Sequence, residues 1–521
     1  MKLIIVHYHL RPGGIRRIIE LATPHLISKL GGVDSVVLAC GEANDRLWNK
    51  TFTQLVCPAR AEFTVAPVFN YVSEQKLSPA RLRVAMNRAL DRLLAKLSGA
   101  DCIVWAHNLG IARNLALTAG LARACEQRGI PLISHHHDWW FDNRWLRWPE
   151  MQRFGARNMS STARTIFPAT KTIRHVAINR TDASVLQRHF REQAGWLPNL
   201  AERATPPSPE RVQAAGRWLQ TRLGDKAAPV WILPCRLLRR KNVAEALLLT
   251  RWLRPDAWLV TTGGVSSRDE QSYFHKLSAA AHRHQWRLRL GVLAGDETRK
   301  PPVAELMAAS ECVMLTSVQE GFGLPYLEAA AAGRPLVARS LPNIAPDLAQ
   351  FGFRFPQYYA EILVHTGLFD WSAERSRQAE RFLRWKKQLP VALRKLATDP
   401  VVLAFATQPA AVPFSRLSLD AQLEVLAQSA ARSWELCAPL NPFLPPWQRR
   451  AAQGTLQITR WPRTAARWLS GCSYAENFKR VLGRRPASQP AQAAAVSVQR
   501  DFFETKLAAA NSYPLLWEAQ S

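Results

Sequence analysis

The sequence has no long hydrophobic run. Among its 521 residues, no stretch of roughly 18 or more apolar residues occurs, although a membrane-spanning helix requires one. The first apolar run, residues 1–8, is too short for a secretory signal peptide and lacks a cleavage-like site. We therefore expect a cytoplasmic protein in which residues 2–8 form the first strand.

The sequence also lacks paired cysteines. Its eight cysteines are scattered without a Cys-x-x-Cys pair, and several lie in apolar, strand-like runs. This distribution favours buried, reduced thiols over disulfides or metal ligands. The consecutive residues His135, His136 and His137 are not expected to converge on a metal, because neighbouring side chains on a strand point to opposite faces.

Acidic residues are few. The chain has 40 Asp and Glu residues against 69 Lys and Arg residues, which gives a formal net charge of +29. This excess favours anionic partners such as nucleotide-sugars or an anionic membrane surface. The basic residues are spread along the chain and are not grouped with aromatic residues in one block, so the pattern disfavours a nucleic-acid partner.

Apolar runs alternate with segments of helical periodicity over residues 1–200. The alternation is typical of a mostly parallel sheet with helices on both faces, and ligands bind such sheets at the carboxyl ends of the strands. The strands are expected at residues 2–8, 34–40, 101–108, 131–138 and 176–179, with helices at 15–27, 79–97 and 111–128.

A proline-rich stretch, residues 204–209, interrupts the alternation before it starts again. We therefore predict an α/β protein with an N-terminal Rossmann-like domain (1–200), a linker (201–228) and a C-terminal Rossmann-like domain (229–435). A cleft between two such domains is the default ligand site. The second domain is expected to contain strands at 230–234, 257–262, 288–293, 312–317 and 335–339, and helices at 244–253, 303–309 and 415–436.

Residues 436–521 form a basic C-terminal extension rich in Pro and Trp. We expect a flexible connector at residues 486–495, followed by a terminal helix at 501–517 that docks back on the fold. Two locations remain open for the Trp and Arg residues of this extension: a membrane surface and the surface of the C-terminal domain.

The most informative segment of the chain is EGFGLPYLE, which begins at Glu320 and ends at Glu328. It follows an apolar, strand-like run and leads into a short helix that Gly333 ends. Pro325 suits the first turn of that helix, where no N–H group is needed, and Glu328 is expected in the same turn. Backbone N–H groups at such a helix start point towards one spot, where a diphosphate fits. Because carboxylates repel phosphate, the two glutamates are expected to accept hydrogen bonds from sugar hydroxyls.

Two cations follow the first strand of the second domain. Arg236 and Lys241 lie between residues 230–234 and the next helix. At a strand end, such a pair is suited to neutralising a diphosphate, and the arginine is able to make a bidentate contact. A basic surface loop is the alternative interpretation.

Polar residues and glycines also end the strands of the first domain. Glycines at a strand-to-helix junction allow a ligand to approach the backbone. The polar residues are expected to form hydrogen bonds at the ligand site rather than to bind a metal. The residues in question are Gly13 and Gly14 after the first strand, His107 and Asn108 after another, and His137 and Asp138 after the next.

In this order, the features resemble retaining glycosyltransferase family 4, which belongs to the group 1 glycosyltransferases and has the two-domain GT-B fold. The resemblance covers roughly residues 1–350 and is most specific at residues 320–328 and the AAAAGRPLVA that follows. It implies a UDP-, GDP- or ADP-sugar donor, a hydroxyl acceptor, and no cofactor or metal. The chain departs from the family at Pro234 and Cys235, where members often carry glycine, and in its basic tail.

The resemblance also implies roles for single residues. Arg236 and Lys241 would hold the donor diphosphate, Glu320 the sugar hydroxyls and Glu328 the ribose hydroxyls. Backbone N–H groups around Gly321, Phe322, Gly323 and Leu324 would face the sugar and phosphate. The acceptor side would include Gly13, Gly14, His107, Asn108 and Asp138. His137 would lie near the reacting carbon, so that Glu320 and His137 are the candidate catalytic residues.

The expected function is transfer of a hexosyl group to a hydroxyl acceptor in glycan, glycolipid or glycoside biosynthesis. The cations and the helix start would stabilise charge on the departing diphosphate. Two alternatives remain: a sugar phosphorylase with the same fold, and a non-catalytic protein that binds an anionic membrane or nucleic acid. The basic surface also leaves open a peripheral location on the inner membrane face.

Overall fold

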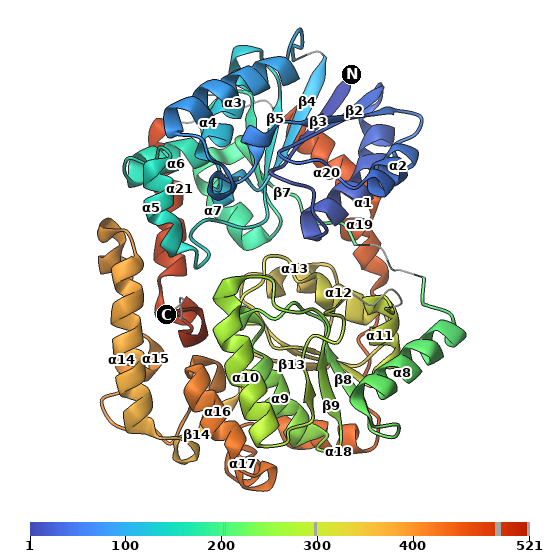
Figure 1. Ribbon diagram of the computed structural model, residues 1–521, viewed down its shortest axis with the longest axis vertical. Helices are drawn as coiled ribbons and strands as arrows, with labels where there is room; N and C mark the ends of the chain where they lie inside the picture. Colours follow the sequence, from blue (N-terminus) through green and yellow to red (C-terminus); the bar gives the residue numbers. More distant parts are fainter. Residues whose placement is uncertain (100, 202, 204, 296–299, 485–490, 518–521) are drawn as a thin grey trace. The chain divides into compact units, whose positions relative to one another are not determined.

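The computed structural model describes residues 1–99, 101–201, 203, 205–295, 300–484 and 491–517. The chain forms two compact units, coloured by sequence position in Figure 1. Unit 1 consists of Met1–Glu202, Gln388–Leu396 and Thr464–Lys506. Unit 2 consists of Arg203–Lys387, Ala397–Arg463 and Leu507–Ser521. Both units are Rossmann-like, as predicted, whereas the expected ligand site between two domains remains a prediction.

Unit 1 is built on a parallel seven-stranded sheet. Its strand order is β3-β2-β1-β4-β5-β6-β7, so the chain moves outwards from β1 first on one side and then on the other. The strands are β1 (Lys2–Val6), β2 (Ser35–Cys40), β3 (Arg60–Val65), β4 (Cys102–His107), β5 (Leu132–His136), β6 (Ile173–Ala177) and β7 (Ala194–Trp196).

Helices cover both faces of this sheet (Figure 1). Successive strand residues alternate between two apolar cores: Leu3 and Ile5 belong to one, and Ile4 and Val6 to the other. The helices of unit 1 are α1 (Gly14–Leu30), α2 (Arg46–Leu55), α3 (Pro79–Leu93), α4 (Leu115–Gln127), α5 (Trp148–Arg153), α6 (Met159–Ile166), α7 (Arg180–Phe190), α19 (Ala466–Leu469), α20 (Gly471–Gly483) and α21 (Gln492–Lys506).

Unit 2 repeats the same plan. Its parallel sheet has the order β10-β9-β8-β11-β12-β13. Two strands that follow in the sequence, β14 and β15, form a separate antiparallel sheet. The strands are β8 (Val230–Leu233), β9 (Trp258–Thr261), β10 (Leu288–Arg289), β11 (Cys312–Leu315), β12 (Leu336–Arg339), β13 (Gln357–Tyr359), β14 (Leu363–His365) and β15 (Ala411–Pro413).

The helices of unit 2 include one that is nearly all buried. In α9 (Val243–Leu253), ten of the eleven residues are buried, so a continuous apolar run produces a core helix. The other helices are α8 (Pro209–Leu223), α10 (Gln271–Arg283), α11 (Val303–Ala309), α12 (Leu324–Ala331), α13 (Ala345–Gln350), α14 (Trp371–Gln388), α15 (Val401–Ala404), α16 (Leu419–Ala427), α17 (Ala430–Cys437) and α18 (Leu444–Ala452).

The C-terminal extension is divided between the two units. Helix α20 packs on α1, and Tyr474, Phe478 and Val481 enter the unit 1 core. Helix α21 packs on α6 and α7 of the same unit. Residues from Leu507 onwards belong to unit 2. The extension is therefore part of both units, whereas residues 436–521 were predicted to form one separate segment.

Other boundaries also differ from the predictions. The supposed linker 201–228 contains α8, because Ser208 and Pro209 start a helix. The strand expected at 288–293 has only two residues, since Gly291 adopts a left-handed conformation at φ +62°. The expected helix 415–436 is two helices, because Ser429 caps a new one. Within the expected connector 486–495, residues 486–490 lie outside the described residues, and α21 begins at Gln492.

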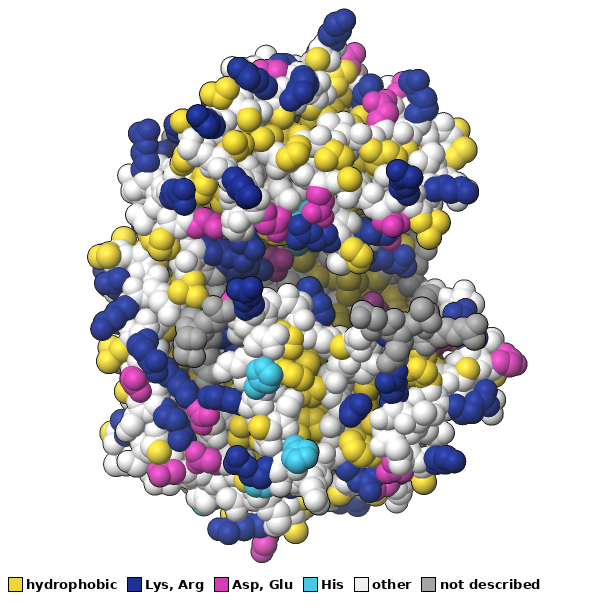
Figure 2. All heavy atoms as spheres, viewed as in Figure 1, with side chains coloured by type: hydrophobic (Ala, Val, Ile, Leu, Met, Phe, Trp, Pro, Cys, Tyr) yellow, Lys and Arg dark blue, Asp and Glu magenta, His cyan; other side chains and the backbone are white. Residues whose placement is uncertain are grey.

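The helices, the cysteines and the distribution of charged side chains agree with three expectations from the sequence. No helix among the described residues is long and apolar enough to cross a membrane. All eight cysteines are free, and six are buried. Figure 2 shows Lys and Arg side chains spread over the visible face of both units, with Asp and Glu between them, rather than gathered in one block.

Candidate functional site

Two neighbouring strands of unit 2 end beside each other and carry the predicted donor residues. Strands β8 and β11 are parallel partners, so the segments that follow them meet at the same sheet edge. The turn after β8 includes a short 3-10 helix, η6 (Arg239–Lys241). The backbone N–H of Val318 donates to the Arg240 carbonyl at 2.8 Å. The Thr316 hydroxyl donates to the carbonyl of Lys241 at 3.0 Å.

Glu320 joins the two segments through its carboxylate. One oxygen, Oε1, pairs with the Lys241 ammonium, and the other, Oε2, lies 2.7 Å from Arg240 Nη1. The side chains of Glu320 and Lys241 are only 10% and 9% exposed, respectively. Burial alone would raise the pKa of Glu320, but the charges of Arg240 and Lys241 outweigh burial and lower the pKa to about 2. Glu320 is therefore ionised and balances a buried lysine charge.

Helix α12 begins at the same place. Its N-cap residue, Gly323, has φ +80°, and no side chain caps the helix. A Cβ atom on Gly323 would lie 2.7 Å from Ile344 Cδ1 and 2.9 Å from Tyr326 Cδ2, so both conformation and space require glycine. Pro325 lies in the first turn, as predicted. Pro325 has no N–H group, and the Tyr326 N–H donates to the Gly323 carbonyl at 2.9 Å, so the positive end of the helix is what suits the start of α12 to an anion.

The other predicted donor residues differ in burial. Arg236 is exposed, and its side chain makes no hydrogen bond or ion pair with a described residue, so it does not share the buried position of Lys241. Glu328 is exposed and lies in the second turn of α12 rather than in the first, because the helix starts at Leu324. Phe322 is buried at 5% exposure. The predicted ligand roles of these residues remain predictions.

Several residues at this edge were not predicted from the sequence. Arg240 pairs with Glu320, and the Asn343 amide donates to the Glu320 carbonyl at 2.7 Å. Gly263 follows β9, and a Cβ atom there would lie 3.1 Å from Arg236 Cα. The sequence signals were a third cation beside Lys241 and a glycine pair after a strand, but neither indicates which way a side chain points.

The predicted polar residues of unit 1 lie at the carboxyl ends of β4 and β5. His107 Nδ1 and His137 Nε2 are 3.1 Å apart. His7, at the end of β1, was not predicted, and its Nδ1 lies 3.2 Å from the His107 carbonyl oxygen. Burial, together with neighbouring histidines, lowers the pKa of His137 and of His107 well below the ordinary value. His137 is therefore neutral near pH 7 and is suited to hydrogen bonding rather than to proton donation from an imidazolium.

Asn108 organises the end of β5. Its side-chain oxygen accepts hydrogen bonds from the backbone N–H groups of His137 at 2.8 Å and Asp138 at 3.0 Å. The Asp138 carboxylate is 45% exposed and lies 3.8 Å from Arg144. Gly13 and Gly14 are exposed at the start of α1, where a Cβ atom would meet nothing closer than 3.9 Å. The start of α1 is therefore open to a ligand.

Three histidines converge more closely than expected. Nitrogens of His107, His135 and His137 all lie within 4.8 Å of one another. His136 points to the opposite face and contacts His175, as the alternation of strand side chains predicts, but positions 135 and 137 share a face. Both ring nitrogens of His135 have partners, Trp105 Nε1 at 3.4 Å and the Leu197 carbonyl at 3.2 Å. A metal would compete with these bonds, and the expectation that none is needed remains a prediction.

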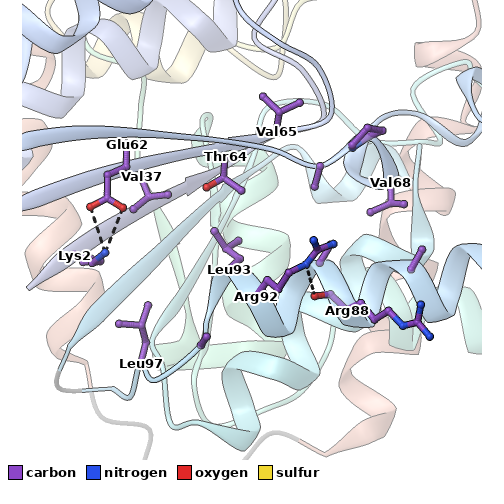
Figure 3. Close-up of a pocket in the computed structure, with 15 residues that line it drawn as sticks. Lys2, Val37, Glu62, Thr64, Val65, Val68, Arg88, Arg92, Leu93 and Leu97 are labelled. Atoms are coloured by element: carbon purple, nitrogen blue, oxygen red, sulfur yellow. Dashed lines mark hydrogen bonds and ion pairs between the residues drawn. The ribbon is translucent and has the colours of Figure 1, made fainter.

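Unit 1 also has a pocket of 560 Å³ on the side of its sheet. Figure 3 shows its walls, which come from strands β2 and β3, the loop after β3, and helix α3. Lys2 and Glu62 form an ion pair at 3.3 Å on one side, and Arg88 and Arg92 project from α3 on the other. None of the predicted site residues lines this pocket, so it is separate from the edges described above.

Comparison with known families identifies the part of the chain that carries the Lys241–Glu320 pair. Residues 223–354 match the model of the family described as glycosyl transferases group 1. Residues 223–354 of unit 2 are therefore similar to a group 1 glycosyltransferase domain. The match contains β8, η6, β11 and the start of α12, which are the elements of the candidate donor site.

Relatives extend the likeness beyond this domain. Mannosylglucosyl-3-phosphoglycerate synthase of Petrotoga mobilis is 22% identical over 351 residues, which are 66% of this chain and 65% of the relative. Mannosylglucosylglycerate synthase of the same organism is 22% identical over 325 residues, 54% of this chain and 70% of the relative. The chain thus spans slightly less than two thirds of the first relative's length.

One solved structure shares the fold of both units. A glycosyltransferase from Rickettsia africae ESF-5 has a TM-score of 0.50, with 12% identity over 92% of this chain and 97% of that one. The pair of Rossmann-like domains is therefore of the GT-B type, as predicted from the sequence.

Proposed function

We propose that the protein is a retaining, family 4-like glycosyltransferase that moves a hexosyl group from a nucleotide diphosphate sugar to a hydroxyl acceptor. The observation that carries this proposal is the buried Lys241–Glu320 pair beside the start of α12 in the group 1 domain. The lysine and the helix start present positive charge at one sheet edge, where a diphosphate is expected to bind.

The chemistry follows from charge. Breaking the bond between sugar and diphosphate leaves negative charge on the diphosphate, and a fixed ammonium group and the positive start of α12 stabilise that charge. Glu320 holds Lys241 in place with one oxygen. A carboxylate has about four acceptor positions, so Glu320 still has capacity for a sugar hydroxyl. In this proposal the leaving diphosphate accepts the proton of the attacking hydroxyl, and the site acts without a metal.

The names of the relatives suggest which acceptors to test first. Both contain a mannosyl, a glucosyl and a glycerate-derived unit. We propose that this chain also makes a small glycoside, so glucosylglycerate and its 3-phospho form are the first acceptors. The high net charge of the chain is compatible with such anionic acceptors, and it is also compatible with work at an anionic inner membrane face.

A donor screen followed by product analysis tests the function. UDP-, GDP- and ADP-sugars are screened by thermal shift, because a ligand that binds only the native state raises the unfolding temperature. The stabilising donor is then incubated with each acceptor, and NMR of the product reports whether the anomeric configuration is retained. Glu320→Ala is expected to abolish turnover. Release of sugar 1-phosphate in the presence of inorganic phosphate would instead identify a phosphorylase, and the absence of any donor binding would contradict the proposal.

A further inference from the structure

The last described segment of the chain returns to the candidate donor site. Residues 507–517, here called the C-terminal strap, follow α21 and contain two 3-10 helices, η12 (Ala509–Asn511) and η13 (Pro514–Leu516). Helix η13 packs against η6, the turn that carries Lys241. Both elements belong to unit 2. A segment from the far end of the sequence thus supports the turn directly.

Arg416 fixes the strap to unit 2. Its guanidinium donates to the carbonyl oxygens of Ala510 and Ser512, each at 2.9 Å, and of Ala509 at 3.2 Å. It also lies over the Tyr513 ring, with 3.9 Å between Cζ and the ring centroid. Arg416 is only 8% exposed, so these contacts replace the water that its charge would otherwise bind.

A chain of hydrogen-bonded polar side chains, all buried except the 26% exposed Glu361, continues from Arg416 towards the donor turn. Glu361 accepts from Arg416 at 3.3 Å and from Arg339 at 2.5 Å. Arg339 is 1% exposed and also pairs with Glu245 in the first turn of α9. The Asn242 amide, directly after Lys241, donates to Glu245 at 3.0 Å. The strap and the donor turn are therefore joined by side-chain bonds as well as by packing.

Apolar contacts hold the outer end of the strap. Leu515 is fully buried, and Trp517 is 3% exposed. The Trp517 ring lies 5.3 Å from Phe382 and 6.2 Å from Trp385, both on α14, between centroids. At the other end, the Thr398 N–H donates to the Leu507 carbonyl at 3.2 Å. The strap is thus anchored on both sides of η13.

We propose that the C-terminal strap is a positioning element of the donor site, and that Arg416 is the positioning residue that holds it on the turn of Arg239–Lys241. The ligand of that turn, a nucleoside diphosphate group, rests on the function proposed above. The strap itself does not touch the reacting atoms. It keeps η6 in the conformation in which Lys241 meets Glu320, so that the cation is in place before a donor arrives.

Hydrogen exchange of the ligand-free protein tests the inference without a donor. The amides of Lys241, Asn242 and Val243 are hydrogen-bonded, so their exchange reports opening of the turn. Arg416→Gln is expected to speed exchange in residues 507–517 and in residues 239–243 by about tenfold or more, since several bonds to a charged group are lost. Leu515→Ala leaves the side-chain hydrogen bonds from Arg416 to Asn242 intact. It should speed exchange in the same two segments.

Arg251→Gln is the matched control. Arg251 also donates to backbone carbonyls within unit 2, those of Leu426 and Gln428. Neither of these residues belongs to the strap. This variant should speed exchange around residues 426–430 and leave residues 239–243 unchanged. The inference is overturned if Arg416→Gln or Leu515→Ala releases the strap while the turn exchanges at the wild-type rate. Should Arg416→Gln fail to fold, the Leu515→Ala result alone decides.

Calorimetric titration separates this inference from the proposed function. UDP, GDP and ADP, together with uridine, guanosine and adenosine, are titrated into the wild type and Arg416→Gln. Affinity for the bound diphosphate should fall by about tenfold or more in the variant. Affinity for the matching nucleoside should stay the same, because the strap supports Lys241, the cation that is expected to bind the diphosphate. If the wild type binds no diphosphate, the proposed function fails, and the exchange experiment still judges the strap.

Discussion

Lys241 carries a buried charge, and Glu320 balances it. An uncompensated buried ammonium is costly, whereas paired charges at this depth hold each other in a fixed geometry. The same pairing explains how Glu320 remains ionised despite its burial, with its pKa lowered to about 2. At the scale of single residues, the candidate donor site is thus already arranged before a ligand is bound.

Replacing Glu320 by glutamine should destabilise unit 2 in a pH-dependent manner. At pH 7 the free energy of unfolding is expected to fall by about 3 kcal/mol, because Lys241 loses its buried partner. The folded pKa of Glu320 lies below its unfolded value of 4.5, so its stabilisation is present above pH 4.5 and is lost as the pH falls towards 2. Urea unfolding of both proteins between pH 7 and pH 3 measures the difference.

Asp420→Asn serves as the comparison, because Asp420 is also a carboxylate paired with two cations of unit 2. Its partners are Arg381 and Lys276, and 29% of its side chain is exposed, so water screens these pairs more than it screens Glu320. Its replacement should cost less at pH 7 than Glu320→Gln does. A stability difference between the wild type and Glu320→Gln that stays constant down to pH 3 would contradict the assignment of the buried pair.

The sequence was sufficient to identify Glu320 and Lys241 as candidate site residues, but not to predict that they form an ion pair. The spacing from Glu320 to Glu328, and the cations after a strand, indicated a ligand edge. Which of the four cations Arg236, Arg239, Arg240 and Lys241 turn inwards depends on the 3-10 helix η6, and nothing in their spacing specifies that turn.

At the scale of elements, the start of α12 depends on one glycine. Gly323→Ala is expected to destabilise unit 2 by about 1–3 kcal/mol, because the added Cβ meets Ile344 and Tyr326 in a left-handed conformation. It should also weaken binding of the donor found in the thermal-shift screen, since α12 would start in a different place. Denaturant unfolding and donor titration measure the two effects.

Gly333, at the other end of the same helix, provides the control. It also has a left-handed conformation, φ +63°, but a Cβ atom there would meet nothing within 4 Å. Gly333→Ala should therefore show only the conformational cost, about 1 kcal/mol, and no change in donor affinity. Equal effects of the two substitutions on donor binding would show that the start of α12 does not shape the site.

The sequence predicted most elements near the site because their periodicity is strong. The helix expected at 303–309 matches α11 residue for residue. Elements without a clear apolar period were missed, such as β3, whose residues are mostly half-buried or exposed at the sheet edge. Pro325 was placed correctly in the first turn of α12, whereas Glu328, predicted in the same turn, lies in the second.

At the scale of the whole molecule, the C-terminal extension completes unit 1. Phe478 on α20 is fully buried in the core that also contains Ile18 of α1. Phe478→Ala should lower the stability of unit 1 by about 3–5 kcal/mol. Native-state hydrogen exchange measures it: amides of β1 and β2 should open more often, while those of β8 and β11 keep the wild-type rate.

A matched substitution in unit 2 completes that experiment. Leu426 on α16 is also fully buried. Leu426→Ala should raise exchange in unit 2 and spare β1 and β2. Unchanged exchange of β1 in Phe478→Ala would contradict the placement of α20 in the core of unit 1.

The packing of the C-terminal extension on the two units could not be predicted from the sequence. The alternation of strands and helices predicted both sheets, because periodicity is local. Where Trp, Arg and Pro residues of a tail pack depends on partners hundreds of positions away, such as α20 on α1 and η13 on η6. Composition alone therefore left a membrane surface and the protein surface as equal alternatives for the tail.

The most direct measurement is titration of the stabilising nucleotide-sugar donor into the wild type and Lys241→Met. Arg240 still balances Glu320 in this variant, so the fold should persist. Lys276→Met, which removes a more exposed lysine from unit 2, makes the same change in net charge and serves as the control. We predict that Lys241→Met weakens donor binding by about tenfold to a hundredfold while the control binds as the wild type does. Wild-type affinity in Lys241→Met would contradict a donor site at this edge.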